Sequence, residues 1–437
     1  MPHVLVADES SGAAPGVRRV GAASLLAAAA LLSSCLPLGV SFHPDGKRVA
    51  LVAARGGEGE EKVSAELRVV AIEDGSSTAV LAAKTMGPPC WTADGKGLHF
   101  LLADEGDEDA WYLCAWDGTT VRKRARFTLR GEATILLFMA PVPAADGRTV
   151  FTTDAVNGRP VLARWDLDEA SMRVLADPGG GPSLSPRGDL LAYFAPRGDG
   201  GERVDLCVVD LEGEGSRVLV TDLCELKDLP PVPPAWSPDG TRIAVTGEGY
   251  WKAKGGGDPL EIVVSDATRG GRRRVSAEGE ASQVPVWSRD GKALYYTAET
   301  GPGSSPRVLR VLAEGGPPAA VPGGEHAFAV GIAPDGKTLA LRTTGRANPE
   351  GGEQLEHGFL RLLDPATGEA RDVMILDREY RDLAAALLGR AGEDPAANVA
   401  AGKAALAVLD RMEKRFPESA KNPRTAALRA AASLVGK

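Results

Sequence analysis

The chain has 437 residues, of which 43% are hydrophobic and 5% aromatic, and its formal net charge is −9. This length is enough for one large domain and a small one. The acidic balance, without a basic patch, excludes a nucleic-acid-binding protein, and 5 cysteines are too few for a disulfide-dense scaffold. The 53 glycines and 31 prolines are typical of many short strands joined by turns.

Residues 1–35 have the pattern of a targeting segment. A pair of arginines precedes an apolar run, Val20 to Leu32, which has the length of a signal-peptide core and is too short to cross a bilayer as a helix. The segment ends in Leu32-Ser33-Ser34-Cys35, which resembles the lipobox of bacterial lipoproteins. This resemblance implies cleavage before Cys35 and acylation of its thiol, and Leu36 after the cysteine favours the outer membrane. The alternatives are an ordinary secretory signal and a buried alanine-rich helix.

A turn motif then recurs seven times between Leu38 and Ile375. Apolar residues precede each copy and an alternating apolar strand follows it. The copies are centred on Asp45-Gly46, Asp94-Gly95, Asp146-Gly147, the degenerate Arg187-Gly188, Asp239-Gly240, Asp290-Gly291 and Asp335-Gly336. Successive copies are 49, 52, 41, 52, 51 and 45 residues apart. A period of this length is the signature of a β-propeller blade.

Asp-Gly between two strand-forming runs favours a hairpin, because glycine adopts positive φ without steric cost. A second turn follows each first one, for example at Asp74-Gly75 and Asp117-Gly118. Each repeat therefore contains two hairpins, whose four antiparallel strands, A to D, form one blade. The predicted fold class is all-β: a seven-bladed β-propeller over residues 36–376. Six blades are the alternative, because a degenerate repeat could be absorbed elsewhere.

The fifth copy carries a resemblance to a known family. Trp236-Ser237-Pro238-Asp239-Gly240 matches, residue for residue, the consensus of the WD40-like, or PD40, repeats of TolB-type periplasmic propellers. The similarity extends from Leu38 to Ile375. It implies a propeller fold and a role as a component of an envelope complex. Trp-Asp pairs at Trp116 and Trp165 stand where WD40 repeats have theirs, whereas the Gly-His pair of true WD40 blades is missing.

The A–B and C–D turns of a blade share one face of the disc, here called the turn face, and the B–C and D–A connections share the other, the loop face. Loop-face connections such as 247–259 and 344–357 are long and variable, which is typical of recognition on a rigid scaffold. Within 247–259, Tyr250, Trp251 and Lys252 lie among glycines. Aromatic residues are frequent hot spots of protein interfaces, so we expect these three residues to bind a partner. The alternatives are that Trp251 folds back on its blade or merely continues strand B.

The sequence indicates no catalytic residue, metal site or cofactor. A serine hydrolase of the prolyl oligopeptidase type needs a Gly-x-Ser-x-Gly elbow and a further α/β pattern, and neither is present in these residues. The acidic run 104–109 does not fit a Ca²⁺ loop, so we expect a solvated loop there. No metal-ligand spacing relates the five histidines, which are His3, His43, His99, His326 and His357.

Four cysteines follow Cys35. Cys90 and Cys114 fall on predicted strands A and C of one blade, which are not neighbours, so we expect no bridge between them. Cys207 and Cys224 flank one hairpin. We expect isolated buried thiols there, with a disulfide as the alternative.

From residue 377 the period changes to a helical one, and we expect a tail over residues 377–437. Tyr380, Leu383, Leu387 and Leu388 form one apolar stripe, and further helices are predicted up to Phe416 and from Pro423 to about Leu434. The segment 407–419 resembles one tetratricopeptide-like hairpin. A single unit of this kind cannot bury its own apolar face. We therefore expect the tail to pack on the propeller or, alternatively, on a partner.

These features predict a lipid-anchored, extracytoplasmic binding or scaffold protein of the cell envelope, with a protein partner and without catalysis. The alternatives are a propeller enzyme, such as a lyase or hydrolase, and a carbohydrate or ligand sensor, both using the channel mouth. Convergence of His, Asp and Glu side chains at that mouth would favour the enzyme.

Overall fold

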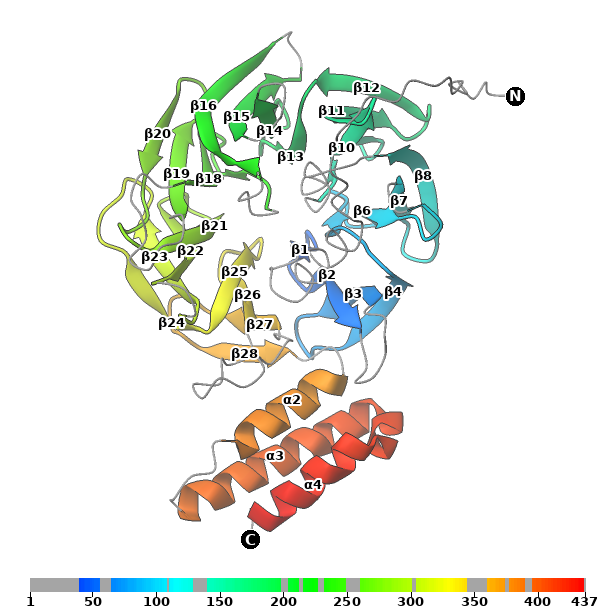
Figure 1. The fold of residues 1–437 in the computed structure, drawn as a ribbon, viewed down its shortest axis with the longest axis vertical. Helices are drawn as coiled ribbons and strands as arrows, with labels where there is room; N and C mark the ends of the chain where they lie inside the picture. Colours follow the sequence, from blue (N-terminus) through cyan, green and yellow to red (C-terminus); the bar gives the residue numbers. More distant parts are fainter. Residues whose placement is uncertain are drawn as a thin grey trace, which may run out of the picture.

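The computed structural model describes residues 39–55, 64–107, 110–128, 140–197, 203–211, 215–226, 232–248, 260–300, 304–343, 360–373, 377–389 and 395–435. In this part of the chain, seven four-stranded antiparallel sheets follow one another around a central axis (Figure 1). Each sheet is one blade, and its four strands are consecutive in the sequence. The predicted seven-bladed propeller is confirmed, and the six-bladed alternative is wrong.

Within each blade the first strand lies nearest the axis and the fourth at the rim (Figure 1). Blade 1 consists of β1 (Ser41–Phe42), β2 (Arg48–Arg55), β3 (Ser64–Ala71) and β4 (Ser77–Ala83). Blade 2 consists of β5 (Cys90–Trp91), β6 (Leu98–Ala103), β7 (Ala110–Trp116) and β8 (Val121–Thr128). Blade 3 consists of β9 (Val142–Pro143), β10 (Thr149–Val156), β11 (Arg159–Asp166) and β12 (Ser171–Ala176).

The other four blades repeat this order. Blade 4 consists of β13 (Gly180–Leu184), β14 (Leu190–Arg197), β15 (Arg203–Asp210) and β16 (Ser216–Glu225). Blade 5 consists of β17 (Ala235–Trp236), β18 (Arg242–Glu248), β19 (Leu260–Asp266) and β20 (Gly270–Arg274). Blade 6 consists of β21 (Ala281–Trp287), β22 (Ala293–Glu299), β23 (Arg307–Leu312) and β24 (Ala319–Glu325). Blade 7 consists of β25 (Ala327–Ile332), β26 (Leu339–Thr343), β27 (Leu360–Leu363) and β28 (Ala370–Val373).

The A–B turns have one recurring geometry. The glycine of each Asp-Gly copy has a positive φ between 68° and 73°, which only glycine adopts without strain. In blade 5 the carboxylate of Asp239 accepts the N–H of Thr241 at 3.0 Å and the hydroxyl of Ser237 at 2.6 Å. The Ser237 hydroxyl also accepts the N–H of Arg242 at 2.9 Å. The side chains therefore close the turn and fix the hairpin register.

The core lies between successive blades. Tyr296 of β22 is fully buried and belongs to one apolar cluster with Ile262 and Val264 of blade 5. Phe100 of β6 is packed in the same way with Leu67 of blade 1. Burying a side chain of this size contributes about 2–3 kcal/mol. Packing between neighbouring blades therefore contributes to the stability of each one.

Blades 1 and 7 meet without an exchanged strand in the described part of the chain, because β1–β4 and β25–β28 are separate complete sheets. An apolar cluster fills this seam, with Val49 and Leu51 from blade 1 and Leu360 and Leu362 from blade 7. The ring is thus closed by side-chain packing.

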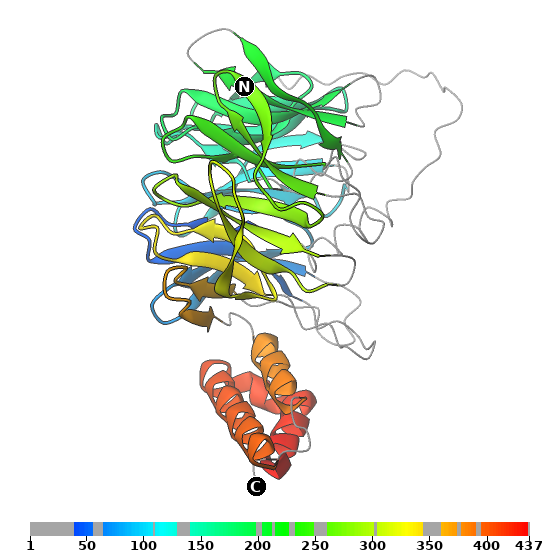
Figure 2. The same ribbon diagram turned by 90° about the vertical axis from the view of Figure 1, so that its left-hand side faces the viewer.

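Three helices follow the last blade: α2 (Asp377–Leu388), α3 (Pro395–Arg415) and α4 (Pro423–Val435), with a 3-10 turn η3 (Pro417–Lys421) before the last. They form a bundle outside the ring (Figure 2), and its own apolar core includes Tyr380, Leu409 and Met412. The predicted tail is therefore helical, and it buries part of its apolar surface within itself. The described helices include none that is long and apolar enough to cross a membrane.

Candidate functional site

The predicted binding residues at positions 250–252 and the predicted lipidation residue Cys35 lie outside the described residues. The structure does describe the base from which residues 249–259 leave the propeller. Strand β18 ends at Glu248 and β19 begins at Leu260, both at the loop-face end of blade 5.

One ion pair between blades 4 and 5 and another within blade 5 hold this base. The Oε2 atom of Glu248 lies 2.8 Å from Nη2 of Arg203, at the start of β15. Arg272 of β20 lies 3.0 Å from Glu261, and the two side chains are only 17% and 6% exposed. The Arg272 guanidinium also donates to the carbonyl of Glu248. Partly buried, hydrogen-bonded pairs are stronger than isolated surface pairs, so this base is held firmly.

The same network continues into blade 4. Nη1 of Arg197 lies 3.6 Å from Asp222, and its Nε lies 3.5 Å from Asp205. The backbone N–H of Asp222 donates to Asp205 at 2.7 Å, and Arg203 also pairs with Asp222. Each guanidinium already faces carboxylates of the chain. The network is therefore a support for the loop and not itself a site for an anionic ligand.

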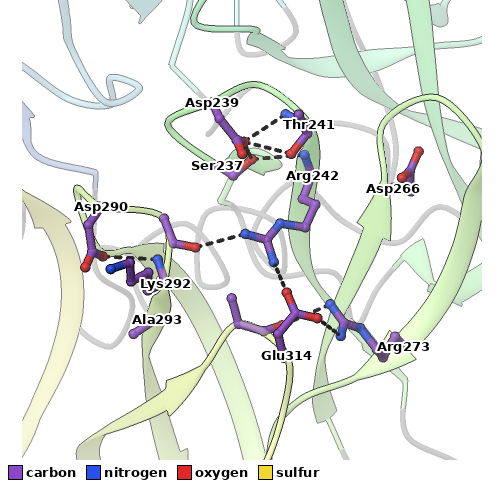
Figure 3. A network of polar contacts seen from close by, with 12 residues as sticks. Ser237, Asp239, Thr241, Arg242, Asp266, Arg273, Asp290, Lys292, Ala293 and Glu314 are labelled. Carbon is purple, nitrogen blue, oxygen red and sulfur yellow. Dashed lines mark hydrogen bonds and ion pairs between the residues drawn. The ribbon is translucent and has the colours of Figure 1, made fainter.

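A second polar network joins blades 5 and 6 on the turn face (Figure 3). The guanidinium of Arg242 donates to the carbonyl of Gly291 at 2.9 Å, pairs with Glu314 at 2.7 Å and lies 4.9 Å from the ring centre of Trp287. Arg273 approaches the other oxygen of Glu314 at 2.8 Å. The hydrogen bond from Arg273 lowers the pKa of Glu314, so this carboxylate is ionised at neutral pH.

Two tryptophans of the motif, Trp236 and Trp287, link their blades to the preceding blade by a hydrogen bond. Nε1 of Trp236 donates to the carbonyl of Ser183 at 2.8 Å, and Nε1 of Trp287 donates to the carbonyl of Ala235 at 2.8 Å. Both acceptors lie on the first strand of the preceding blade. In these copies the Trp-Ser-x-Asp-Gly motif therefore acts as an interblade lock as well as a turn.

The arginines that lie over the rings of Trp91 and Trp287 were not identified from the sequence. Arg48 lies 5.5 Å from the ring centre of Trp91, which repeats the arrangement of Arg242 and Trp287 in another pair of blades. In both cases the arginine stands three residues after the aspartate of its turn. The next copy of the turn motif along the chain carries the tryptophan that the arginine covers. That spacing is the signal that would have found them.

Of the described histidines, His43 makes two polar contacts through its ring nitrogens. Nδ1 of His43 lies 2.6 Å from Asp45, and its Nε2 lies 2.9 Å from the carbonyl oxygen of Gly95. Burial lowers the pKa of His99 to about 4, so its imidazole is neutral at pH 7. Within the described ranges, no group of three His, Cys, Asp or Glu side chains is placed to hold a metal ion.

One carboxyl group is buried without a cation beside it. Asp154 of β10 is 2% exposed, and its Oδ2 accepts the indole N–H of Trp165 at 3.1 Å. Its Oδ1 accepts the backbone N–H of Ala155 at 2.6 Å. Burial raises the pKa of Asp154 to about 6. The group ties β10 to β11 within blade 3, and these contacts give it a structural role.

The acidic run in blade 2 is engaged by protein donors. Asp104 accepts the N–H of Gly106 at 3.0 Å and the hydroxyl of Tyr112 at 2.8 Å. Asp107 pairs with Arg126 at 2.8 Å. Residues 108–109 lie outside the described residues.

The cysteines from position 90 onward are free thiols. Isolated buried thiols are confirmed for Cys207 and Cys224, and the alternative disulfide between them is wrong. Burial raises the pKa of the thiols of Cys114 and Cys207 to about 12, so neither is a thiolate at neutral pH.

No family model matches the sequence. The β-propeller domain of the Trilobed protease from Pyrococcus furiosus, whose topology is described as open velcro, is 11% identical, and the match covers 77% of this chain and 96% of that one with a TM-score of 0.51. Puromycin hydrolase is 17% identical over 79% of this chain and 55% of its own, with a TM-score of 0.51. TolB from Acinetobacter baumannii is 17% identical over 62% of this chain and 65% of its own, with a TM-score of 0.42.

At these identities the similarity shows the fold alone. It is a β-propeller, and TolB proteins are among the propellers that match. The chain spans about half the length of puromycin hydrolase and slightly less than two thirds of that TolB chain.

Proposed function

We propose that this chain is a non-catalytic binding protein of the bacterial cell envelope, anchored by a lipid on Cys35, which presents the loop face of its propeller to a protein partner. The base of the 249–259 loop is the observation that carries this proposal. Glu248 is tied to blade 4 through Arg203 and to β20 through Arg272. A loop that leaves a firmly held base loses less conformational freedom when its side chains engage a partner.

The chemistry of the loop indicates what such a partner offers. Tyr250 and Trp251 supply large apolar surfaces with one polar atom each, and Lys252 adds a positive charge. An apolar pocket bordered by an acidic side chain on the partner would complement this sequence.

The binding role is tested by capturing partners from detergent-solubilised envelopes after cross-linking. Trp251→Ala is expected to weaken binding of the captured partner by about 10- to 30-fold, the usual effect of removing an aromatic hot spot. The control is Leu312→Ala, which removes a 53% exposed apolar side chain on the turn face, at the opposite end of the blades. Capture of the same partners at the same strength by Trp251→Ala and wild type would refute the role of this loop.

The lipid anchor is tested separately, by metabolic labelling with a palmitate analogue and fractionation of membranes. Cys35→Ser is expected to lose the label and to move to the soluble fraction. Cys90→Ser, at a half-buried thiol of the propeller, should keep both the label and the membrane association. A wild-type chain that takes up no label, or a Cys35→Ser chain that still does, would remove the anchor from the proposal.

A further inference from the structure

The ring depends on side chains where its first and last blades meet. In the described part of the chain no strand of blade 1 pairs with a strand of blade 7. The seam is held by the apolar cluster around Val49 and Leu362, and by a hydrogen bond from Arg371 to the carbonyl of Glu73. The other neighbouring blades are consecutive in the sequence, whereas blades 1 and 7 are not, so further contacts across this seam matter.

The helical bundle supplies such a contact. It continues directly from blade 7, because β28 ends at Val373 and α2 begins at Asp377. At the end of α3, Nη2 of Arg415 donates to the carbonyl of Gly75 and lies 3.5 Å from the hydroxyl of Ser77. Both acceptors belong to the C–D hairpin of blade 1. The bundle is therefore joined covalently to blade 7 and by hydrogen bonds to blade 1 (Figure 2).

The contact is closely fitted on both sides. Nη1 of Arg415 lies 3.3 Å from the hydroxyl of Tyr380 in α2, and its guanidinium carbon lies 5.6 Å from the ring centre of Phe416. Gly75 has a φ of 71°, and a Cβ on it would lie 3.1 Å from Val373 and 3.8 Å from Arg415. The glycine thus allows blade 1, blade 7 and α3 to meet at one point.

We propose that the C-terminal bundle is a clasp that closes the propeller between blades 1 and 7, where no exchanged strand does so. The bundle has an apolar core of its own, built on Leu409 and Met412, so it can leave the seam without unfolding. After release of Arg415 from the hairpin of blade 1, the apolar cluster and the Arg371 bond still join the two blades in the described part of the chain.

Hydrogen exchange of the full chain, followed by mass spectrometry, tests the clasp. Arg415→Ala is expected to accelerate exchange in β1–β4 and β25–β28 by about 5- to 30-fold, the effect of losing a charge-assisted hydrogen bond. Strands β13–β20, on the far side of the ring, should be unchanged. Arg411→Ala is the matched control, because Arg411 is exposed on the same helix and its Nε donates to Ala407 within that helix.

A second variant perturbs the clasp from the propeller side. Gly75→Ala leaves every bundle residue in place but puts a methyl group against Val373 and Arg415, so it should accelerate exchange in the same two blades. If Arg415→Ala accelerates exchange in the bundle alone, the bundle is not a clasp. The same conclusion follows if both variants accelerate exchange equally in all seven blades.

Discussion

Aspartates of this chain show how position decides the chemistry of one residue type. The hydroxyl of Ser237 and the backbone N–H of Thr241 lower the pKa of Asp239 to about 2, so this turn carboxylate is ionised under all ordinary conditions. Burial raises the pKa of Asp154 to about 6, although the carboxyl accepts two hydrogen bonds. The first group stabilises the fold as an anion, whereas burial makes ionisation of the second unfavourable for the fold.

The buried carboxyl of Asp154 predicts a pH-dependent stability. Because its pKa is higher in the folded protein than in the unfolded chain, its contribution is fully present below about pH 4 and is lost as the pH rises through about 6. Asp154→Asn cannot ionise, but its amide has one acceptor oxygen and so loses one of the two accepted hydrogen bonds at every pH. The difference in the free energy of unfolding between the variant and wild type should therefore shift in favour of the variant by about 1–3 kcal/mol between pH 4 and pH 8. Urea unfolding at both pH values measures this, and an equal change at both would contradict it.

The interblade hydrogen bond of Trp287 predicts a difference between two tryptophans. The indole N–H of Trp287 donates to Ala235, whereas that of Trp91 is buried without a hydrogen-bond partner in the described structure. Both rings are 5% exposed and both are covered by an arginine. Trp287→Phe should therefore lower the free energy of unfolding by about 1–2 kcal/mol more than Trp91→Phe. Equal losses in urea unfolding would show that ring packing alone stabilises these positions.

At the scale of elements, the turns were predictable and their contacts were not. Asp-Gly predicts positive φ at the glycine and a carboxylate that accepts backbone N–H groups, because both follow from residues within one turn. The packing of one turn on the next brings together copies about fifty residues apart, as where His43 of blade 1 meets the Gly95 turn of blade 2. Nothing local in the sequence specifies such a pair.

Two glycines with the same backbone conformation allow the strain within a turn to be distinguished from its contact with a neighbouring turn. Gly95 and Gly147 have φ values of 69° and 73°. A Cβ on Gly95 would lie 2.3 Å from Nε2 of His43, whereas one on Gly147 meets no atom within 4 Å. Gly147→Ala should lower the free energy of unfolding by about 1 kcal/mol through backbone strain, and Gly95→Ala by about 1–3 kcal/mol more through overpacking. Equal losses of free energy of unfolding in the two variants, measured by thermal unfolding, would mean that the A–B turn of blade 1 moves away from the new methyl group without a cost.

At the scale of the whole molecule, the repeats determined the number of blades but not how they are held. Seven copies of one turn sufficed to predict the seven blades. The ion pairs that support Glu248, and the contact of Arg415 with Gly75, join segments from different blades or from the bundle. Their partners are set by the closed ring, so they could be recognised only in three dimensions. The tail was predicted as helices, but its own core and its place at the seam were not.

Blade 3 is expected to be the least stable part of the ring. Its turn copy, Ala144 to Gly147, lacks the serine and proline of blade 5, and Pro143 stands where blade 5 has its interblade tryptophan. A Cβ on Gly147 or on Gly188 would meet no neighbouring turn within 4 Å, whereas the glycines of the other five A–B turns each face the preceding turn.

Local opening should therefore cost less free energy in blade 3 than in blade 5. Native-state hydrogen exchange of the wild-type chain is expected to show amides of β9–β12 exchanging at least about 10-fold faster than those of β17–β20, since each missing interblade hydrogen bond is worth about 1 kcal/mol. Only amides that are hydrogen-bonded within the four-stranded sheets are compared, so that exposed turns do not contribute. Equal protection of the two blades would mean that apolar packing between blades, and not the Trp-Ser-Pro-Asp-Gly lock, sets the stability of each one.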